Sequence, residues 1–381
     1  MRYWAGSLCC LLLTGCVTAP VPRPADSLFN DRVFVAPTAR ISAADVFALS
    51  DEMKHYLTDI APQLRSKGSR QGLIDAVTTS GQLKLDYDSM MTRNAAQAFA
   101  ARSGNCLSLV IMTAAFAKAL DLPVRYQSVF TVETVGRSGT TQFFIGHINL
   151  NLGEKQIDVG PGRRNDLMTI DFFPPQEGRG LSTRAVSEES IVAMYMNNRA
   201  AEIFIQGQFD DAYWWARAAI GQDPRFLSAY NTLGLVYHRH GNLVEAEKVF
   251  AYVLEREPKN THIMSNLVHL LDDMGRGVEA HALASKLEQL EPHPAFSYFN
   301  LGMKALHDGN PGVAKDLFTK EVDRAPYYHE FRFWLGVAYL RLGDFDHARQ
   351  QLTLAMEYAT TRNDQDLYAA KLERIRSSRP Q

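Results

Sequence analysis

The chain has 381 residues, of which 46% are hydrophobic and 22% are charged. This balance is typical of a folded globular protein and argues against disorder. The formal net charge is −2 and there is no long basic block, so the sequence argues against nucleic acid as a partner and against a polybasic membrane patch. The length is sufficient for two domains and a tether.

The first 16 residues resemble the leader of a bacterial lipoprotein. Arg2 supplies a positive charge, residues 4–13 form a short apolar run, and Leu13-Thr14-Gly15-Cys16 resembles a lipobox. The run is too short to span a bilayer. We therefore expect a lipoprotein signal peptide over residues 1–15 and lipid on Cys16. An ordinary signal peptide or a buried N-terminal helix is the alternative.

Residues 16–40 are expected to form a tether, because several prolines interrupt them. The apolar side chains of Phe29, Val33, Phe34 and Val35 are expected to dock back on the globular part. Val17, rather than Asp, follows the lipidated cysteine. By resemblance to Gram-negative lipoproteins, this implies sorting to the outer membrane, with the protein facing the periplasm and the lipid as its membrane anchor.

Helices are expected next. Ser42 is a plausible N-cap for a helix that runs to about Ile60, where Pro62 ends it. Short helices are expected over residues 73–77 and 94–101. Polar, turn-forming residues stop at Asn105, and an apolar helical pattern then runs from Cys106 to about residue 120.

After residue 123 the hydrophobic pattern changes to an alternation with a period of two residues, which predicts β-strands. Residues 124–132, 142–152 and 156–159 are rich in β-branched and aromatic side chains, with a turn at 136–140. His147 and Asp158 fall on neighbouring strands of this arrangement. Residues 160–186 contain many glycines and prolines and are expected to form a long loop or linker.

The C-terminal half is a repeat with a period of 34 residues, the length of a tetratricopeptide repeat. Three sets of residues keep this spacing: Pro224, Pro258, Pro292 and Pro326; Gly207, Gly241, Gly275, Gly309 and Gly343; and Ala212, Ala246, Ala280, Ala314 and Ala348. The glycines suit tight turns between antiparallel helices, and the alanines suit close helix crossings. We expect five helix pairs over residues 187–360 and a capping helix with a tail over residues 361–381.

Cys106 is the residue that points most directly to chemistry. Its place in the first turn of a helix favours the nucleophilic thiolate, because the helix dipole and backbone N–H groups stabilise negative charge. If residues 1–15 are removed and Cys16 is lipidated, Cys106 is the only thiol left. Nucleophile, base and orienting acid then follow in the order Cys106, His147, Asp158. Each residue alone could instead be structural, as a core cysteine, a satisfied strand histidine and a turn cap.

Residues 86–159 resemble the transglutaminase-like branch of the papain-like cysteine enzymes. The resemblance lies in the segments 87–88, 92–99, 104–108, 146–149 and 157–158. It implies an α+β domain over residues 41–186 with core 86–159, Cys106 as nucleophile, His147 as general base and acid, and Asp158 as its orienting partner. The family often has an aromatic residue where this chain has Leu107, and Gln127 is a candidate second donor to the oxyanion.

The expected fold is thus an α+β papain-like domain followed by an all-α tetratricopeptide solenoid. No cofactor is expected, and Cys106, His147 and Asp158 make a poor zinc signature because no two of them are closely spaced. The expected function is amide hydrolysis or acyl transfer, with a protein or peptide held by the repeats; the alternative is a catalytically silent scaffold lipoprotein. The candidate partner-binding residues on first helices of the repeats are Asn197, Asn231, His238, Arg239, His262 and His269.

Overall fold

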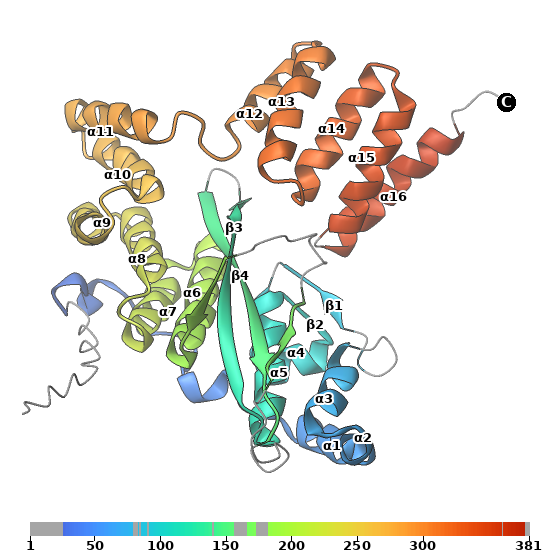
Figure 1. The fold of residues 1–381 in the computed structure, drawn as a ribbon. Helices are drawn as coiled ribbons and strands as arrows, with labels where there is room; N and C mark the ends of the chain where they lie inside the picture. Colours follow the sequence, from blue (N-terminus) through green and yellow to red (C-terminus); the bar gives the residue numbers. More distant parts are fainter. Residues whose placement is uncertain are drawn as a thin grey trace, which may run out of the picture.

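The computed structural model describes residues 26–78, 83, 85–89, 91–138, 141–155, 166–172, 182–359 and 361–377. Small helices and a four-stranded sheet form the N-terminal half, and paired helices form the C-terminal half (Figure 1). None of the described helices is long and apolar enough to cross a membrane.

The N-terminal half begins with short 3-10 segments and three short helices. These are η1 (Asp26–Leu28), η2 (Asp31–Val33), η3 (Ala43–Asp45), α1 (Asp51–Asp59), α2 (Ala61–Lys67) and α3 (Ser69–Thr78). The expected helix from Ser42 is wrong, because Ser42 precedes only a single 3-10 turn and makes no side-chain cap. Ser50 is the true cap, since its hydroxyl accepts from the Met53 N–H and acidic residues follow it. Pro62 lies in the first turn of α2, a position that proline tolerates.

Two helices lead into the sheet. In α4 (Ala95–Ala101), Asn94 and Gln97 form a reciprocal capping box. A two-stranded parallel pair flanks this helix in the sequence, with β1 (Asp86–Tyr87) before it and β2 (Ser103–Gly104) after it. Then α5 (Cys106–Ala119) is buried from Cys106 to Ala117, as the apolar sequence predicts.

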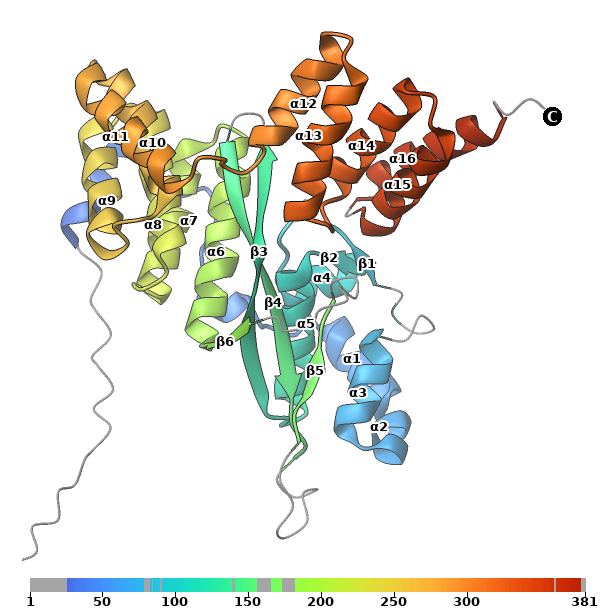
Figure 2. The ribbon, with the colours of Figure 1, turned by 45° about the horizontal axis from the view of Figure 1, so that its top comes forward.

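The main sheet has the strand order β5-β4-β3-β6 and is antiparallel throughout. Its strands are β3 (Val124–Ser138), β4 (Thr141–Leu152), β5 (Met168–Ile170) and β6 (Ser182–Val186). The β3–β4 hairpin confirms the predicted change of period. The stretch expected to be a loop contributes both edge strands, β5 and β6, whereas the expected strand at 156–159 lies outside the described residues. Helix α5 packs on β4, α6 packs on β3, and the two helices also contact each other, so both lie against the hairpin (Figures 1 and 2).

Five helix pairs and a final helix form the C-terminal half, as the 34-residue lattice predicts. They are α6 (Glu188–Ile205), α7 (Phe209–Gln222), α8 (Leu227–His240), α9 (Leu243–Arg256), α10 (Thr261–Asp273), α11 (Gly277–Leu290), α12 (Ser297–His307), α13 (Pro311–Arg324), α14 (His329–Arg341), α15 (Phe345–Tyr358) and α16 (Arg362–Ser377). The five turn glycines have φ between 73° and 89°, a conformation that suits glycine. The five lattice alanines are buried.

One hydrophobic core joins the two halves. It runs from Leu28 through α5 and the sheet to Leu270 in α10. Two separate clusters lie in the last repeats, one between Phe296 and Ala338 and the other between Phe333 and Ile375. The first repeats therefore share their core with the sheet, whereas the last repeats have their own.

The segment before α1 docks on the first repeats, as its apolar residues predict. The Tyr237 hydroxyl donates to the Leu28 carbonyl at 3.0 Å, and Asp31 accepts from the Tyr213 hydroxyl at 2.6 Å. Phe34 is buried and stacks on Tyr213 with ring centroids 3.9 Å apart. Val35 remains 69% exposed.

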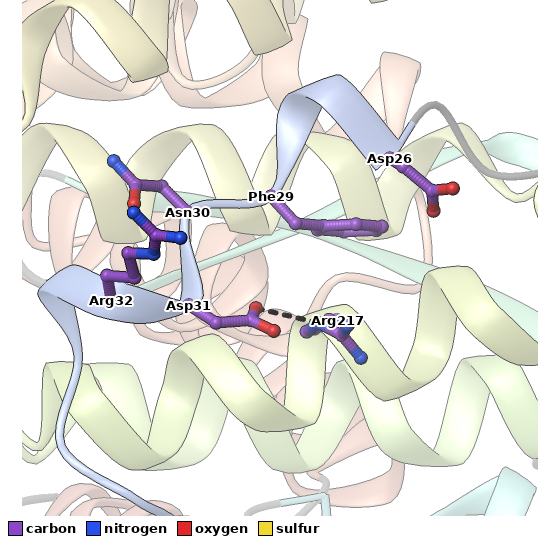
Figure 3. A pocket seen from close by; sticks show the side chains of 6 residues that line it. All are labelled: Asp26, Phe29, Asn30, Asp31, Arg32 and Arg217. Atoms are coloured by element: carbon purple, nitrogen blue, oxygen red, sulfur yellow. Dashed lines mark hydrogen bonds and ion pairs between the residues drawn. The ribbon is translucent and has the colours of Figure 1, made fainter.

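A hollow of about 460 Å³ lies beside this segment, lined by Asp26, Phe29, Asn30, Asp31, Arg32 and Arg217. Figure 3 shows Asp31 paired with Arg217, whose Nε donates to the carboxylate at 2.8 Å. None of its lining residues belongs to the predicted thiol site, and all of them except Arg217 belong to the docked segment.

Candidate functional site

Cys106 is the first residue of α5 and carries a buried, free thiol. Asn105 caps the helix, because its Oδ1 accepts from the Ser108 N–H at 2.9 Å and from the Ser108 hydroxyl at 2.8 Å. The backbone is tightly packed just before this cap. A Cβ on Gly104 would lie 2.6 Å from that of Ser108, so only glycine fits without a shift. The predicted position of the thiol at a helix N-terminus is confirmed.

His147 lies on β4, opposite Val129 of β3. Its Nε2 is 2.7 and 2.9 Å from the two carboxylate oxygens of Asp171, which follows β5. The imidazole also interacts with Cys106. The structure therefore brings together a thiol from a helix, an imidazole from a central strand and a carboxylate from the end of an edge strand.

The electrostatics of this group favour a charged imidazole. Burial opposes protonation of His147, but hydrogen bonds to Asp171 and Cys106 and the negative charge at both outweigh it. Together they raise the pKa of His147 to about 9. A pKa of about 9 means that the ring is mostly cationic at neutral pH.

Tyr87 completes the cluster. This residue pairs with Gly104 across β1 and β2, and its side chain interacts with both the backbone and the thiol of Cys106. Burial and the negative charge at Cys106 raise the pKa of the Tyr87 hydroxyl far above its usual value. The hydroxyl therefore keeps its proton and remains able to donate a hydrogen bond. The sequence carried Tyr87 within the resemblance but assigned it no role.

Two of the predicted catalytic positions need comment. Asp158 and Cys16 lie outside the described residues, so their roles stay predictions. The carboxylate that contacts His147 among the described residues is that of Asp171, which the sequence reasoning did not name. The available signal was the short alternation Thr169-Ile170-Asp171 within the supposed loop. Gln127 is half-buried on β3, opposite Asn149, and its role as an oxyanion donor stays a prediction.

The candidate partner-binding residues all lie on first helices of the pairs: Asn197 on α6, Asn231, His238 and Arg239 on α8, and His262 and His269 on α10. Two of them link α8 to α10. Asn231 Oδ1 accepts from Asn266 at 2.7 Å, and His238 Nε2 is 2.7 Å from an Asp273 oxygen. Among the described residues, no group of three or more His, Cys, Asp or Glu could hold a metal ion.

Comparison with known proteins bears on the repeats. A family model described as Tetratricopeptide repeat matches residues 206–261 and 267–361, so the C-terminal part of the chain carries tetratricopeptide repeats. No curated protein matches the chain.

Several solved structures are similar to the chain. PilF of Pseudomonas aeruginosa has 18% identity over 51% of this chain and 96% of its own, with a TM-score of 0.28. A thermophilic repeat protein of Thermus thermophilus has 19% identity over 48% and 99%, with a TM-score of 0.28. YrrB, described as a repeat protein with an unusual peptide-binding site, has 20% identity over 47% and 92%, with a TM-score of 0.25. These TM-scores are too low to extend the assignment beyond the repeats.

Proposed function

We propose that the α+β half is a transglutaminase-like, papain-like domain that performs cysteine-dependent acyl transfer on an amide. One observation carries the proposal: His147 contacts the Asp171 carboxylate through Nε2 at 2.7 Å and also interacts with the Cys106 thiol. A base held by a carboxylate beside a helix-terminal thiol is the arrangement that activates a cysteine nucleophile.

The proposed reaction follows from the charges. The Cys106 thiolate attacks the amide carbonyl carbon, and the positive end of the α5 dipole stabilises the oxyanion, with the Tyr87 hydroxyl as a hydrogen-bond donor. As the C–N bond breaks, the imidazolium of His147 gives its proton to the leaving nitrogen. A thioester remains on Cys106. Neutral His147 then takes a proton from water, which attacks the thioester and releases the acid and the thiolate.

Water is the proposed acceptor, which makes the reaction a hydrolysis. No residue of the cluster marks a site for a second amine. A periplasmic protein, a peptide tail and the cross-bridge peptides of peptidoglycan all contain the required amide.

The repeats are proposed to bind a protein or peptide through the first helices of their pairs. The tetratricopeptide match supports this role, because such repeats stack into extended surfaces used for binding. The comparisons support binding better than catalysis, since the family match covers the repeats alone. A catalytically silent scaffold that assembles envelope proteins is therefore the second candidate.

We also propose that the chain is a lipoprotein of the outer membrane that faces the periplasm. The support is the Leu13-Thr14-Gly15-Cys16 sequence behind a short apolar run. Membrane fractionation of wild type and Cys16→Ala tests it. The alanine variant is expected in the soluble fraction, and equal membrane retention of both chains would remove the support.

The test of catalysis is the rate at which iodoacetamide alkylates Cys106 as a function of pH, followed by intact mass. Wild type is expected to react rapidly at neutral pH, whereas His147→Gln reacts only at alkaline pH. Cys106→Ser controls for other sites of alkylation. Identical profiles for wild type and His147→Gln would leave the scaffold as the better reading.

A further inference from the structure

The first repeat helix is bonded to the segment that carries the thiol. The link passes through Thr92, which lies between β1 and α4 and is 1% exposed. The Thr92 hydroxyl oxygen accepts from Asn105 Nδ2 at 2.8 Å and from Asn198 Nδ2 of α6 at 3.2 Å. The residue before the nucleophile and a residue of the repeats thus share one buried acceptor.

A second bond from the same helix holds the same residue. The Thr92 N–H donates to Glu202 Oε1 at 2.6 Å, and Arg199 pairs with the other oxygen of Glu202 at 2.5 Å. Burial raises the pKa of Glu202, while Arg199 and Thr92 oppose that rise. Both the backbone and the side chain of Thr92 are therefore fixed from α6.

The other end of the link is the cap of the catalytic helix. The Asn105 carboxamide donates to Thr92 through Nδ2 and accepts from Ser108 through Oδ1. Fixing both ends of this carboxamide fixes the orientation of the first turn of α5, where Cys106 and its backbone N–H lie. A displaced nucleophile loses reactivity steeply, because reactive geometry tolerates only small errors.

From these contacts we infer that Asn198 of the first repeat helix, acting through Thr92 and Asn105, is a positioning residue for the Cys106 thiol. The inference rests on the proposed thiol function and adds a physical connection between the two halves.

The experiment measures Cys106 alkylation by iodoacetamide between pH 5 and 10 in the full chain. Asn198→Ala and Thr92→Val are each expected to slow alkylation at pH 7 by about fivefold, the factor equivalent to about 1 kcal/mol. At pH 10, where the thiol ionises without help, their rates should equal that of wild type. Thr92→Ser keeps the hydroxyl and is expected to restore the wild-type profile.

Asn260→Ala is the matched control. Asn260 is a half-buried asparagine of the repeats whose side chain caps α10 through the Ile263 N–H at 3.0 Å. Its loss removes a comparable structural contact far along the repeats, and the pH profile should stay at that of wild type.

The possible outcomes separate cleanly. If wild type and His147→Gln show the same pH dependence of Cys106 alkylation, the proposed function fails. If His147→Gln changes the alkylation profile but Asn198→Ala keeps that of wild type, the positioning role is overturned while the proposed function stands. Faster alkylation of Asn198→Ala at every pH would mean that the buried thiol has become exposed by local unfolding, and this also overturns the positioning role.

Discussion

Replacing Asp171 by Asn tests which carboxylate controls His147. The fold raises the pKa of His147 from 6.5 to about 9, a difference worth roughly 3 kcal/mol at about 1.4 kcal/mol per unit. A carboxylate in direct contact with a charged group typically accounts for about 1–3 units. Asp171 contacts Nε2 through both oxygens, at 2.7 and 2.9 Å. Asp171→Asn should therefore lower the pKa of His147 by at least about one unit.

The assay is NMR titration of histidine ring carbons in isotopically labelled protein. The chain has 11 histidines, and loss of one resonance in His147→Gln identifies the relevant signal. Asp158→Asn is the matched control, because it makes the same chemical change at the residue expected from the sequence. The reasoning is refuted if Asp158→Asn lowers the pKa of His147 while Asp171→Asn leaves it at about 9. A wild-type value near 6.5 would refute it as well.

Two further predictions concern stability. Gly234→Ala should destabilise the repeats by about 1–3 kcal/mol, because the added Cβ would lie 2.4 Å from the Phe250 ring. The added Cβ of Gly221→Ala meets open space, so this substitution should stabilise its helix by roughly 0.5–1 kcal/mol. Equal urea midpoints for the two variants would contradict this. Because the pKa of His147 is raised by folding, its contribution to stability is complete below about pH 6.5 and is lost as pH rises toward 9. Urea unfolding of wild type and of His147→Gln, both under reducing conditions, should show a difference in unfolding free energy that narrows across this window, and a widening difference would count against it.

The repeats were predictable because their signals are local and recur. Each unit needs a tight turn and a close helix crossing, so glycine and alanine return every 34 residues. The structure gives Gly241 a φ of 89° and Gly275 a φ of 73°, and it buries Ala246 completely. The same logic failed at Ser42, whose side chain makes no capping hydrogen bond and which precedes only a single 3-10 turn. Ser50 has acidic residues in the first turn after it and begins the actual helix.

The thiol site was only partly predictable, because some of its features depend on neighbouring residues and others on contacts between segments far apart in the sequence. A helix N-terminus is a local feature, so Cys106 could be placed at the start of α5 from its neighbours. The carboxylate that contacts His147 depends on which strand pairs with β4, and the spacing of residues along the chain does not predict that pairing. Ile170 pairs with Leu150, which brings Asp171 beside His147 from a stretch whose glycines and prolines indicated a loop.

The shared core changes how the two halves should be understood. The sequence places a domain boundary near residue 187, but Ile191 and Met196 of α6 are buried in the same cluster as Ile111 of α5 and Leu150 of β4. A repeat fragment cut at residue 187 would expose that face of α6 and would lose its bonds to Thr92. Helix α6, the first helix of the repeats, is therefore also part of the hydrophobic core of the N-terminal half. Because Asn198 and Glu202 of this helix bond to Thr92, the proposed thiol activity is best tested in the full chain.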